Sequence, residues 1–540
     1  MRKLVECVPN FSEGRNPEII EAIAESIRKT PGCTLLDVDP GKSTNRTVYT
    51  FVGSPEAIVE GAINSAKTAR KLIDMRHQKG EHPRIGALDV CPFVPVANVS
   101  MEECAECANE FGRRVAEEIG IPIYLYEYAQ DKEYRKKLPQ IREGEYEAIP
   151  ERIIKPEWKP DFGPAKFIPE WGATVTGARL FLIAYNVNIL GTNNQAHRIA
   201  LDIREGGRSD NEPGLFKEVK AIGWFVDEYN MAQISINLTN FKVTPPHIAF
   251  EEVKRKAKEL NIGVAGSELV GLIPLEAMLI AADYYIEKEN LFIFEEDQKI
   301  KLVADRLGLN SVSKFVPEKR IIEYMIKEEH NEPLADMSVR SFVESVAART
   351  SAPGGGSVSA LLAALGVGLC TMVSRLTYGV RKFEDVEPQM KIIIPPLYEL
   401  TYKLIPMNDA DTNAFNDYME ATRLPKGTEE EKKSRNTAMQ NGLKKAIEVP
   451  LTTMRLGNSA WESIVELAKY GNIASRSDVE VGARALETGI WGAYKNVLIN
   501  MPGIEDKEFK KKILSEAEET VERAKLKCNE ALDILAKRTK

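Results

Sequence analysis

Short apolar runs alternate with helical stretches over the first 180 residues of the chain. Apolar side chains recur at three- and four-residue spacing over residues 55–73 and 101–119, which predicts two helices. Runs of β-branched and aromatic residues between them predict strands. The predicted strands cover residues 4–8, 34–38, 48–52, 90–96 and 122–126. Together they indicate an α+β sandwich with helices on one face of a sheet.

A second unit of the same kind follows an irregular segment at residues 158–172. The predicted strands cover residues 179–189, 219–226, 231–237 and 263–267, and the predicted helices cover residues 192–205, 246–260 and 274–286. Two βαβ-type units of similar size predict paired subdomains with a cleft between them, the usual place for a small ligand.

The pattern changes class at about residue 335. Residues 327–337 form a polar segment that contains Pro333, and beyond it the alternation typical of strands nearly disappears. Helical spacing continues instead, which predicts an all-α bundle. The predicted helices cover residues 338–349, 357–377, 390–424, 428–458, 461–470, 478–499 and 506–538.

The length of 540 residues exceeds what one hydrophobic core supports, so several domains are expected. We therefore predict two α+β sandwich subdomains followed by an all-α helical bundle. The expected boundaries are residues 1–180, 181–326, a linker at 327–337, and 338–540. The bundle either carries a second function or serves as an oligomerisation unit.

Composition narrows the class of protein. The 72 Lys and Arg residues against 80 Asp and Glu residues give a net charge of −8, which argues against nucleic-acid or membrane-surface binding. Seven scattered cysteines are typical of reduced thiols, and Cys104 and Cys107 lie on a predicted helix without a second ligand pair, so no metal site is expected. Residues 1–10 lack a signal-peptide core, and the longest apolar stretch, 358–373, is shorter than the ~20 residues of a membrane span. We expect a cytoplasmic protein without an integral membrane segment.

The best candidate for proton transfer is His82, one of five histidines. It lies between Glu81 and Arg84 in the run Gly80-Glu-His-Pro-Arg, just before an apolar strand. Imidazole titrates near neutrality, so a small shift of its pKa suits it to general acid or base catalysis. The alternative is a structural histidine held by a backbone carbonyl.

Polar side chains also gather where predicted strands end. Asn10 follows the first strand, and Asp39 and Arg46 flank the Gly-Lys-Ser-Thr run at residues 41–44. A long loop mixes aromatic residues with Gly and Pro, and such loops can cover a flat ring or merely connect domains. Its residues are Gly163, Pro164, Ala165, Lys166, Phe167, Ile168, Pro169, Glu170, Trp171 and Gly172.

Two features of the helical half suggest a second site. Gly354, Gly355, Gly356 and Ser357 precede the most apolar predicted helix, where free amides favour an anion or a ligand. Asp409 and Asp411 lie within another helical pattern, and a buried carboxylate there would have the raised pKa of an acid-base catalyst. Exposed helix carboxylates are the alternative.

These segments together resemble the bifunctional formimidoyltransferase-cyclodeaminase family. The resemblance lies in Leu4-Val-Glu-Cys-Val-Pro-Asn-Phe-Ser-Glu-Gly14, Ser43-Thr-Asn-Arg-Thr-Val-Tyr-Thr-Phe-Val-Gly53, Gly80-Glu-His-Pro-Arg84 and Ala352-Pro-Gly-Gly-Gly-Ser357. The motifs occur in the order of the family and span the whole chain.

The resemblance implies two folate reactions of histidine degradation. The first half would transfer the formimino group of N-formimino-L-glutamate to N5 of tetrahydrofolate, and the all-α half would cyclise 5-formiminotetrahydrofolate to 5,10-methenyltetrahydrofolate with loss of ammonia. It also implies that His82 and Asp411 are catalytic and that residues 163–172 bind folate. Asn10, Asp39, Arg46, Glu81, Arg84 and Gly354–Ser357 remain further substrate-binding candidates.

The resemblance further implies polyglutamylated tetrahydrofolate as co-substrate, no metal, and a homo-oligomer, with an octamer as one copy number. The alternative keeps the transferase active and makes the helical half an oligomerisation module.

Overall fold

The structure describes residues 3–42, 44–80, 83–209, 211–326 and 332–538. Among them, seven strands form a mixed sheet in the first subdomain. The structure is a computed structural model. The sheet order is β1-β4-β2-β5-β7-β6, and β3 pairs with β4. The strands are β1 (Leu4–Cys7), β2 (Asn10–Phe11), β3 (Cys33–Gly41), β4 (Arg46–Gly53), β5 (Leu88–Ala97), β6 (Ile123–Glu127) and β7 (Thr174–Ala178).

Local sequence explains where the main helices of this subdomain begin. The Ser54 side chain caps α2 (Pro55–Leu72), and proline follows at the first helical position. Ser100 and Glu103 form a reciprocal capping box at the start of α3 (Met101–Ile119). Both helices and the five predicted strands are therefore confirmed, whereas α1 (Pro17–Arg28) was not predicted.

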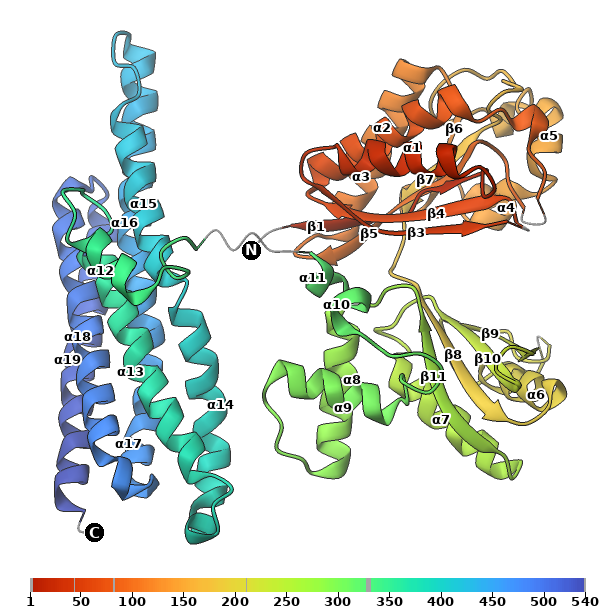
Figure 1. Cartoon of the computed structure of the whole chain (residues 1–540). Helices are drawn as coiled ribbons and strands as arrows, with labels where there is room; N and C mark the ends of the chain where they lie inside the picture. Colours follow the sequence, from red (N-terminus) through yellow and green to blue (C-terminus); the bar gives the residue numbers. More distant parts are fainter. Residues whose placement is uncertain (1–2, 43, 81–82, 210, 327–331, 539–540) are drawn as a thin grey trace. The chain divides into compact units, whose positions relative to one another are not determined.

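The sheet is covered on both faces, so the expectation of helices on one face only is wrong. Helices α1, α2 and α3 pack on one face around Cys7, Phe51 and Phe93 (Figure 1). Two short helices, α4 (Leu138–Arg142) and α5 (Glu145–Arg152), supply Ile141 and Ile149 to a smaller core on the opposite face. The central strands β5 and β7 and the edge strand β6 bury side chains on both faces.

The second subdomain is a four-stranded sheet in the order β11-β8-β10-β9. Since β10 pairs antiparallel with both β8 and β9, those two strands run parallel with β10 between them, a split βαβ arrangement. Its strands are β8 (Ile183–Leu190), β9 (Val219–Val226), β10 (Met231–Leu238) and β11 (Gly263–Val270). Its helices are α6 (Asn193–Ile203), α7 (Pro246–Glu259), α8 (Leu275–Glu289), α9 (Glu296–Arg306), α10 (Pro317–Arg320) and α11 (Ile322–Met325).

The predicted strand at 179–189 starts later than expected. Residues 174–178 form β7, which pairs in parallel with β5 and β6 of the first sheet, and β8 begins only at Ile183. The intervening residues cross between subdomains. The two subdomains share a core, because Leu4, Val52 and Val94 of the first sheet belong to the same buried cluster as Ile273 and Ile321.

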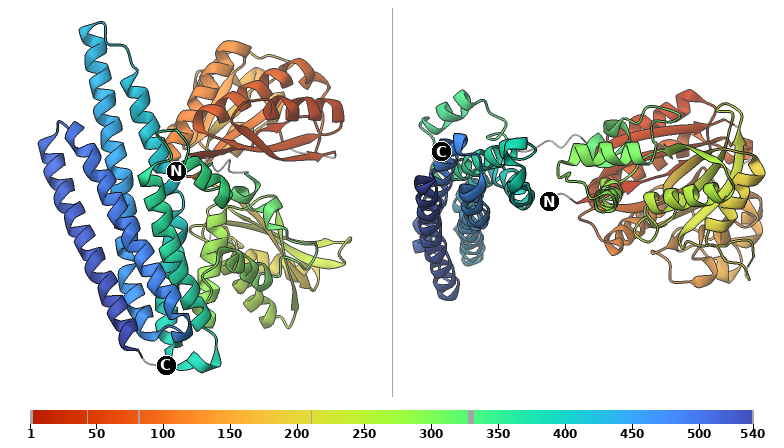
Figure 2. Two further views of the ribbon diagram at one scale, coloured as in Figure 1. Left: turned by 60° about the vertical axis from the view of Figure 1, so that its left-hand side comes forward. Right: turned by 90° about the horizontal axis from the view of Figure 1, so that it is seen from below.

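The second compact unit, Glu328–Lys540, is a helical bundle, so the predicted change of class is confirmed. Its long helices run side by side in the left view of Figure 2. The helices of this unit are α12 (Val339–Val346), α13 (Gly355–Thr377), α14 (Glu387–Leu404), α15 (Met407–Thr422), α16 (Glu429–Ser459), α17 (Trp461–Tyr470), α18 (Arg476–Asn500) and α19 (Lys507–Lys537). The helix expected over 390–424 breaks at Ile405-Pro406, where Pro406 has no amide hydrogen to donate to the preceding turn, although both residues keep right-handed helical dihedral angles.

Helix α13 has 23 residues and confirms the helix predicted over 357–377, with Gly355 and Gly356 added at its start. By length and composition alone it could cross a membrane, yet 61% of its most apolar window is buried within the protein. It packs against α14, α15 and α18, which confirms the prediction of a buried helix.

Candidate active sites in the two units

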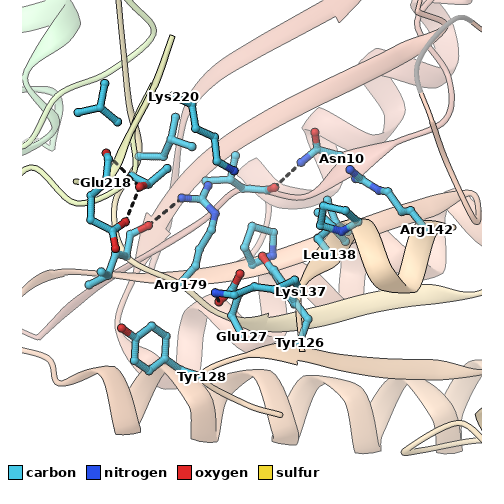
Figure 3. Close-up of a pocket in the computed structure, with 18 of the residues that line it drawn as sticks. Asn10, Tyr126, Glu127, Tyr128, Lys137, Leu138, Arg142, Arg179, Glu218 and Lys220 are labelled. Carbon is cyan, nitrogen blue, oxygen red and sulfur yellow. Dashed lines mark hydrogen bonds and ion pairs between the residues drawn. The ribbon is translucent and has the colours of Figure 1, made fainter. Parts of the chain in front are cut away.

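A cavity of about 1030 Å³ lies between the two subdomains of the first unit. The first subdomain contributes residues of β2, β4, β5, β6 and α4, and the second contributes the segment that follows α6 and the start of β9 (Figure 3). Its volume matches the upper range of small-molecule sites, and its position confirms the predicted cleft.

Basic side chains dominate the polar lining of this cavity. Among the described residues, six basic side chains line it against three acidic ones. The basic ones are Arg46, Lys137, Arg142, Arg179, Arg204 and Lys220, and the acidic ones are Glu127, Glu205 and Glu218. One acid is already neutralised, because Glu127 accepts a hydrogen bond from Lys137 at 2.8 Å. The cavity therefore suits an anionic ligand.

A buried network forms the wall of the cavity on the first subdomain. The carboxylate of Asp89, 1% exposed, pairs with Arg46 at 3.3 Å and with Arg142. Arg46 Nε also donates to Asn10 Oδ1 at 2.8 Å. Burial lowers the pKa of Arg46 to about 10; Asp89 opposes this shift and Arg142 adds to it. Among the described residues, the two guanidinium groups of this wall thus share the Asp89 carboxylate.

The structure brings only some of the predicted residues to this cavity. Asn10 and Arg46 line it, whereas Asp39 is exposed on β3. Arg84 instead lines a separate hollow of about 470 Å³ and pairs with Glu145 and Glu147, each at 3.0 Å. His82 and Glu81 lie outside the described residues, so their roles stay predictions.

The predicted folate loop, residues 163–172, contains no regular secondary structure, as expected, but it does not contribute to the lining of the large cavity. Trp171 is 0% exposed, and its indole Nε1 donates to Thr174 Oγ1 at 2.9 Å. Trp171 therefore belongs to the core and has no exposed ring face for a ligand. Pro164, Ala165 and Lys166 are exposed, and folate binding by this loop stays a prediction.

A second site lies where α15 meets the start of α13. The Asp411 carboxylate faces Gly356 and accepts a hydrogen bond from Ser357 Oγ at 3.3 Å. Burial raises the pKa of Asp411 above its usual range, and hydrogen bonds from the Ser357 hydroxyl and amide oppose that shift. Ser357 Oγ also lies 3.0 Å from Thr412 Oγ1 and donates to the Asn408 carbonyl at 2.8 Å. A half-buried carboxylate with raised proton affinity is suited to proton transfer.

The neighbouring Asp409 has a different environment. It is 3% exposed, and its two carboxylate oxygens accept hydrogen bonds from the backbone amides of Leu334 at 2.8 Å and Ala335 at 3.0 Å. Both oxygens are therefore engaged in holding the segment that precedes α12. This contrast favours Asp411 over Asp409 as the residue available to a substrate.

Gly356 leaves the space that the Asp411 carboxylate occupies. A Cβ at residue 356 would lie 2.1 Å from Oδ1 and 2.4 Å from Cγ of Asp411. We expect Gly356→Ala to displace the Asp411 carboxylate and thereby to lower the rate of the reaction predicted for the helical unit about 10²-fold. That loss is typical of a misplaced catalytic group. Steady-state kinetics of the second reaction measure this.

Gly355→Ala is the matched control, since its Cβ would meet nothing closer than Asn496 Nδ2 at 3.5 Å. Equal rates for the two alanine variants would show that contact with Asp411 does not matter.

The sequence analysis missed most of the cationic lining of the large cavity. Lys137 and Arg142 belong to the basic run at residues 132–142, and that charge density was the available signal. No comparable sequence pattern surrounds Arg179 or Lys220. Their place in the cavity depends on how the two subdomains pack, which the local sequence does not show. No group of three or more His, Cys, Asp or Glu side chains able to hold a metal occurs among the described residues.

Comparison with known proteins covers the chain from end to end. Three family models match: the formiminotransferase domain, N-terminal subdomain, at residues 4–179; the formiminotransferase domain at 184–327; and formiminotransferase-cyclodeaminase at 338–519. A formimidoyltransferase-cyclodeaminase of Dictyostelium discoideum is 59% identical over 540 residues, 100% of both chains.

Each half also resembles a separate enzyme. The glutamate formimidoyltransferase of Streptococcus pyogenes serotype M1 is 41% identical over 54% of this chain and 95% of its own length. The methenyltetrahydrofolate cyclohydrolase of Methylorubrum extorquens is 33% identical over 34% of this chain and 87% of its own length. Because the similarity covers the full length and family models match both halves, the chain belongs to the formimidoyltransferase-cyclodeaminase family.

Proposed function

We propose that the first unit transfers the formimino group of N-formimino-L-glutamate to N5 of tetrahydrofolate in the cavity between its subdomains. The second unit then closes 5-formiminotetrahydrofolate to 5,10-methenyltetrahydrofolate and releases ammonia at Asp411. The observation that carries this proposal is the full-length match to bifunctional enzymes. The surplus of basic side chains in the cavity supports it, because both transferase substrates carry carboxylates.

The transferase step needs a base. N5 of the pterin loses a proton as it attacks the formimino carbon, the C–N bond to glutamate breaks, and glutamate leaves with a proton. A neutral imidazole at His82 is the proposed acceptor and donor of that proton. In the second step N10 attacks the same carbon of the protonated formimino group, and ionised Asp411 accepts the proton that N10 loses. Asp411 then returns this proton to the amino group, which leaves as ammonia when its bond to that carbon breaks.

A two-signal assay with formiminoglutamate and tetrahydrofolate tests the whole proposal. Release of glutamate reports the first unit, and the absorbance of the methenyl product reports the second. Glutamate release without a methenyl signal would instead support the alternative, in which the helical half serves oligomerisation only.

The pH dependence of the second reaction tests the role of Asp411. Because burial raises the pKa of Asp411, we expect the rate to fall with decreasing pH at a value above the ordinary range of aspartate. Ser357 opposes this shift, so Ser357→Ala is expected to move the acid limb of the kcat profile to still higher pH. Superimposable profiles of the variant and the wild type would contradict the assignment.

A second candidate activity for the helical unit is hydrolysis of the methenyl product. The similarity to a methenyltetrahydrofolate cyclohydrolase favours it. A water molecule would attack the methenyl carbon, Asp411 would accept its proton, and the bond from that carbon to N5 would break, giving the 10-formyl compound. Decay of methenyl absorbance on addition of enzyme, faster than the buffer rate and abolished in Asp411→Asn, would establish it.

We also propose that the protein is located in the cytoplasm and forms a homo-oligomer. All seven cysteines are described and are free thiols, which supports a reducing compartment. Exposed apolar side chains on α13 and α14, among them Leu365, Leu376 and Ile392, support association between copies. Sedimentation of the full chain and cell fractionation test the two statements.

A further inference from the structure

Two arginines that line the large cavity, Arg46 and Arg142, share one buried carboxylate, that of Asp89. Asp89 is 1% exposed and lies between Arg46 and Arg142, whose side chains are 15% and 14% exposed. Its Oδ1 also accepts a hydrogen bond from the Ile85 amide at 2.9 Å. Among the described residues, both guanidinium groups therefore pair with the same carboxylate, that of Asp89.

The two arginines differ in how their donors are used. Arg46 donates to Asn10 and pairs with Asp89, so it is held from two sides. Arg142 Nη2 donates to Asp89, but its Nε is buried and meets no hydrogen-bond acceptor among the described residues. A buried donor without an acceptor is costly, and guanidinium presents its donors as a planar fork that matches a carboxylate.

The position of Arg142 directs it to the cavity. It ends α4 and lines the cavity beside Asn10, as the close-up shows (Figure 3). Asp89 holds it there, because its carboxylate binds Nη2 of the guanidinium group. The part of the Arg142 side chain that remains exposed, 14%, is available to a carboxylate of a ligand in the cavity.

We propose that Arg142, oriented by Asp89, is the carboxylate-binding residue of a subsite in the transferase cavity. This inference rests on the proposed function, in which two substrates bring carboxylates to this cavity. One source is the amino-acid substrate, and the other is the glutamyl part of the folate. Arg142 makes a charge-assisted contact with one of them and thereby sets which molecules bind.

Arg142→Gln tests the subsite in the full-length protein. We expect the KM of one substrate to rise about ten- to hundredfold, as for the loss of a charge-assisted hydrogen bond, with little change in kcat. A higher KM for formiminoglutamate, with weaker binding of L-glutamate in calorimetry, assigns the subsite to the amino acid. A higher KM for tetrahydrofolate assigns it to the folate.

Two controls separate this effect from others. Arg113→Gln removes one positive charge from the surface of α3, where Arg113 pairs with Glu110 and Glu117, and both KM values should stay within about twofold. Arg142→Lys keeps the positive charge but loses the planar fork of donors. If the contact is bidentate, this variant should raise the same KM as Arg142→Gln. It also replaces the glutamine variant in the test if that variant does not fold.

Unchanged KM values and unchanged L-glutamate binding in a folded Arg142 variant would overturn the subsite. A wild-type enzyme that releases no glutamate from formiminoglutamate would overturn the proposed function instead.

Discussion

Asp411→Asn is expected to lower the kcat of the cyclodeaminase reaction by about 10²–10⁴-fold, the range of a lost general acid-base catalyst. The amide keeps the size of the side chain and its acceptor oxygen for Ser357, but it cannot exchange a proton at neutral pH. The transferase rate should not change, because Asp411 belongs to the other compact unit. Parallel measurement of glutamate release and methenyl absorbance gives both rates.

Two other aspartates on the same helix provide controls. Asp417 is half exposed and pairs with Lys445 at the surface, so Asp417→Asn should leave both rates and stability unchanged. Asp409 binds two backbone amides, so Asp409→Asn should lower thermal stability while the folded fraction keeps its rate. A cyclodeaminase that tolerates Asp411→Asn but loses kcat in Asp409→Asn would reverse the assignment.

Trp171→Ala is expected to lower the free energy of unfolding of the first unit by about 3–5 kcal/mol, the range for truncating a large buried aromatic residue. The indole is 0% exposed within the core formed by the first sheet and its helices. Its Nε1 bonds Thr174, whose hydroxyl in turn donates to the Leu88 carbonyl at 2.7 Å. Urea unfolding of the full chain, followed by circular dichroism, measures the loss.

Lys166→Ala separates the structural role of the loop from folate binding. Lys166 is exposed in the same loop, so its removal should change stability by less than about 0.5 kcal/mol. A higher KM for tetrahydrofolate at unchanged stability would support the predicted folate contact. A Trp171→Ala variant as stable as the wild type would refute the core assignment.

Local sequence predicted most of the helices and strands of both units. The helix at 101–119 is fixed by its apolar spacing and by the reciprocal bonds of Ser100 and Glu103, and all of these residues are close in sequence. Pro406 is a helix-breaking signal in the sequence, but the helical spacing of apolar residues on both sides of it led to the prediction of one continuous helix over 390–424. The helices α4 and α5 were not predicted, because they are short and are stabilised by the second face of the sheet.

Candidate residues were predicted less completely than secondary structure. Asn10 and Arg46 were selected for their positions at strand ends, and β2 and β4 pair so that both reach the cavity. Arg179 and Lys220 come from opposite sides of the subdomain boundary and meet only after folding. Asp39 was selected by the same argument as Arg46, yet it lies exposed on a strand that pairs on one side only.

The sequence by itself determined the periodic elements, the change from an α+β to an all-α architecture near residue 335, and the family. Those properties depend on residues that are near neighbours in the chain. Only the tertiary structure decided which charges meet: Arg46, Asp89 and Arg142 are far apart in sequence but share one wall. It also distinguished Asp409 from Asp411, since residues two apart on a helix point to different sides, and only packing determines which side meets Gly356.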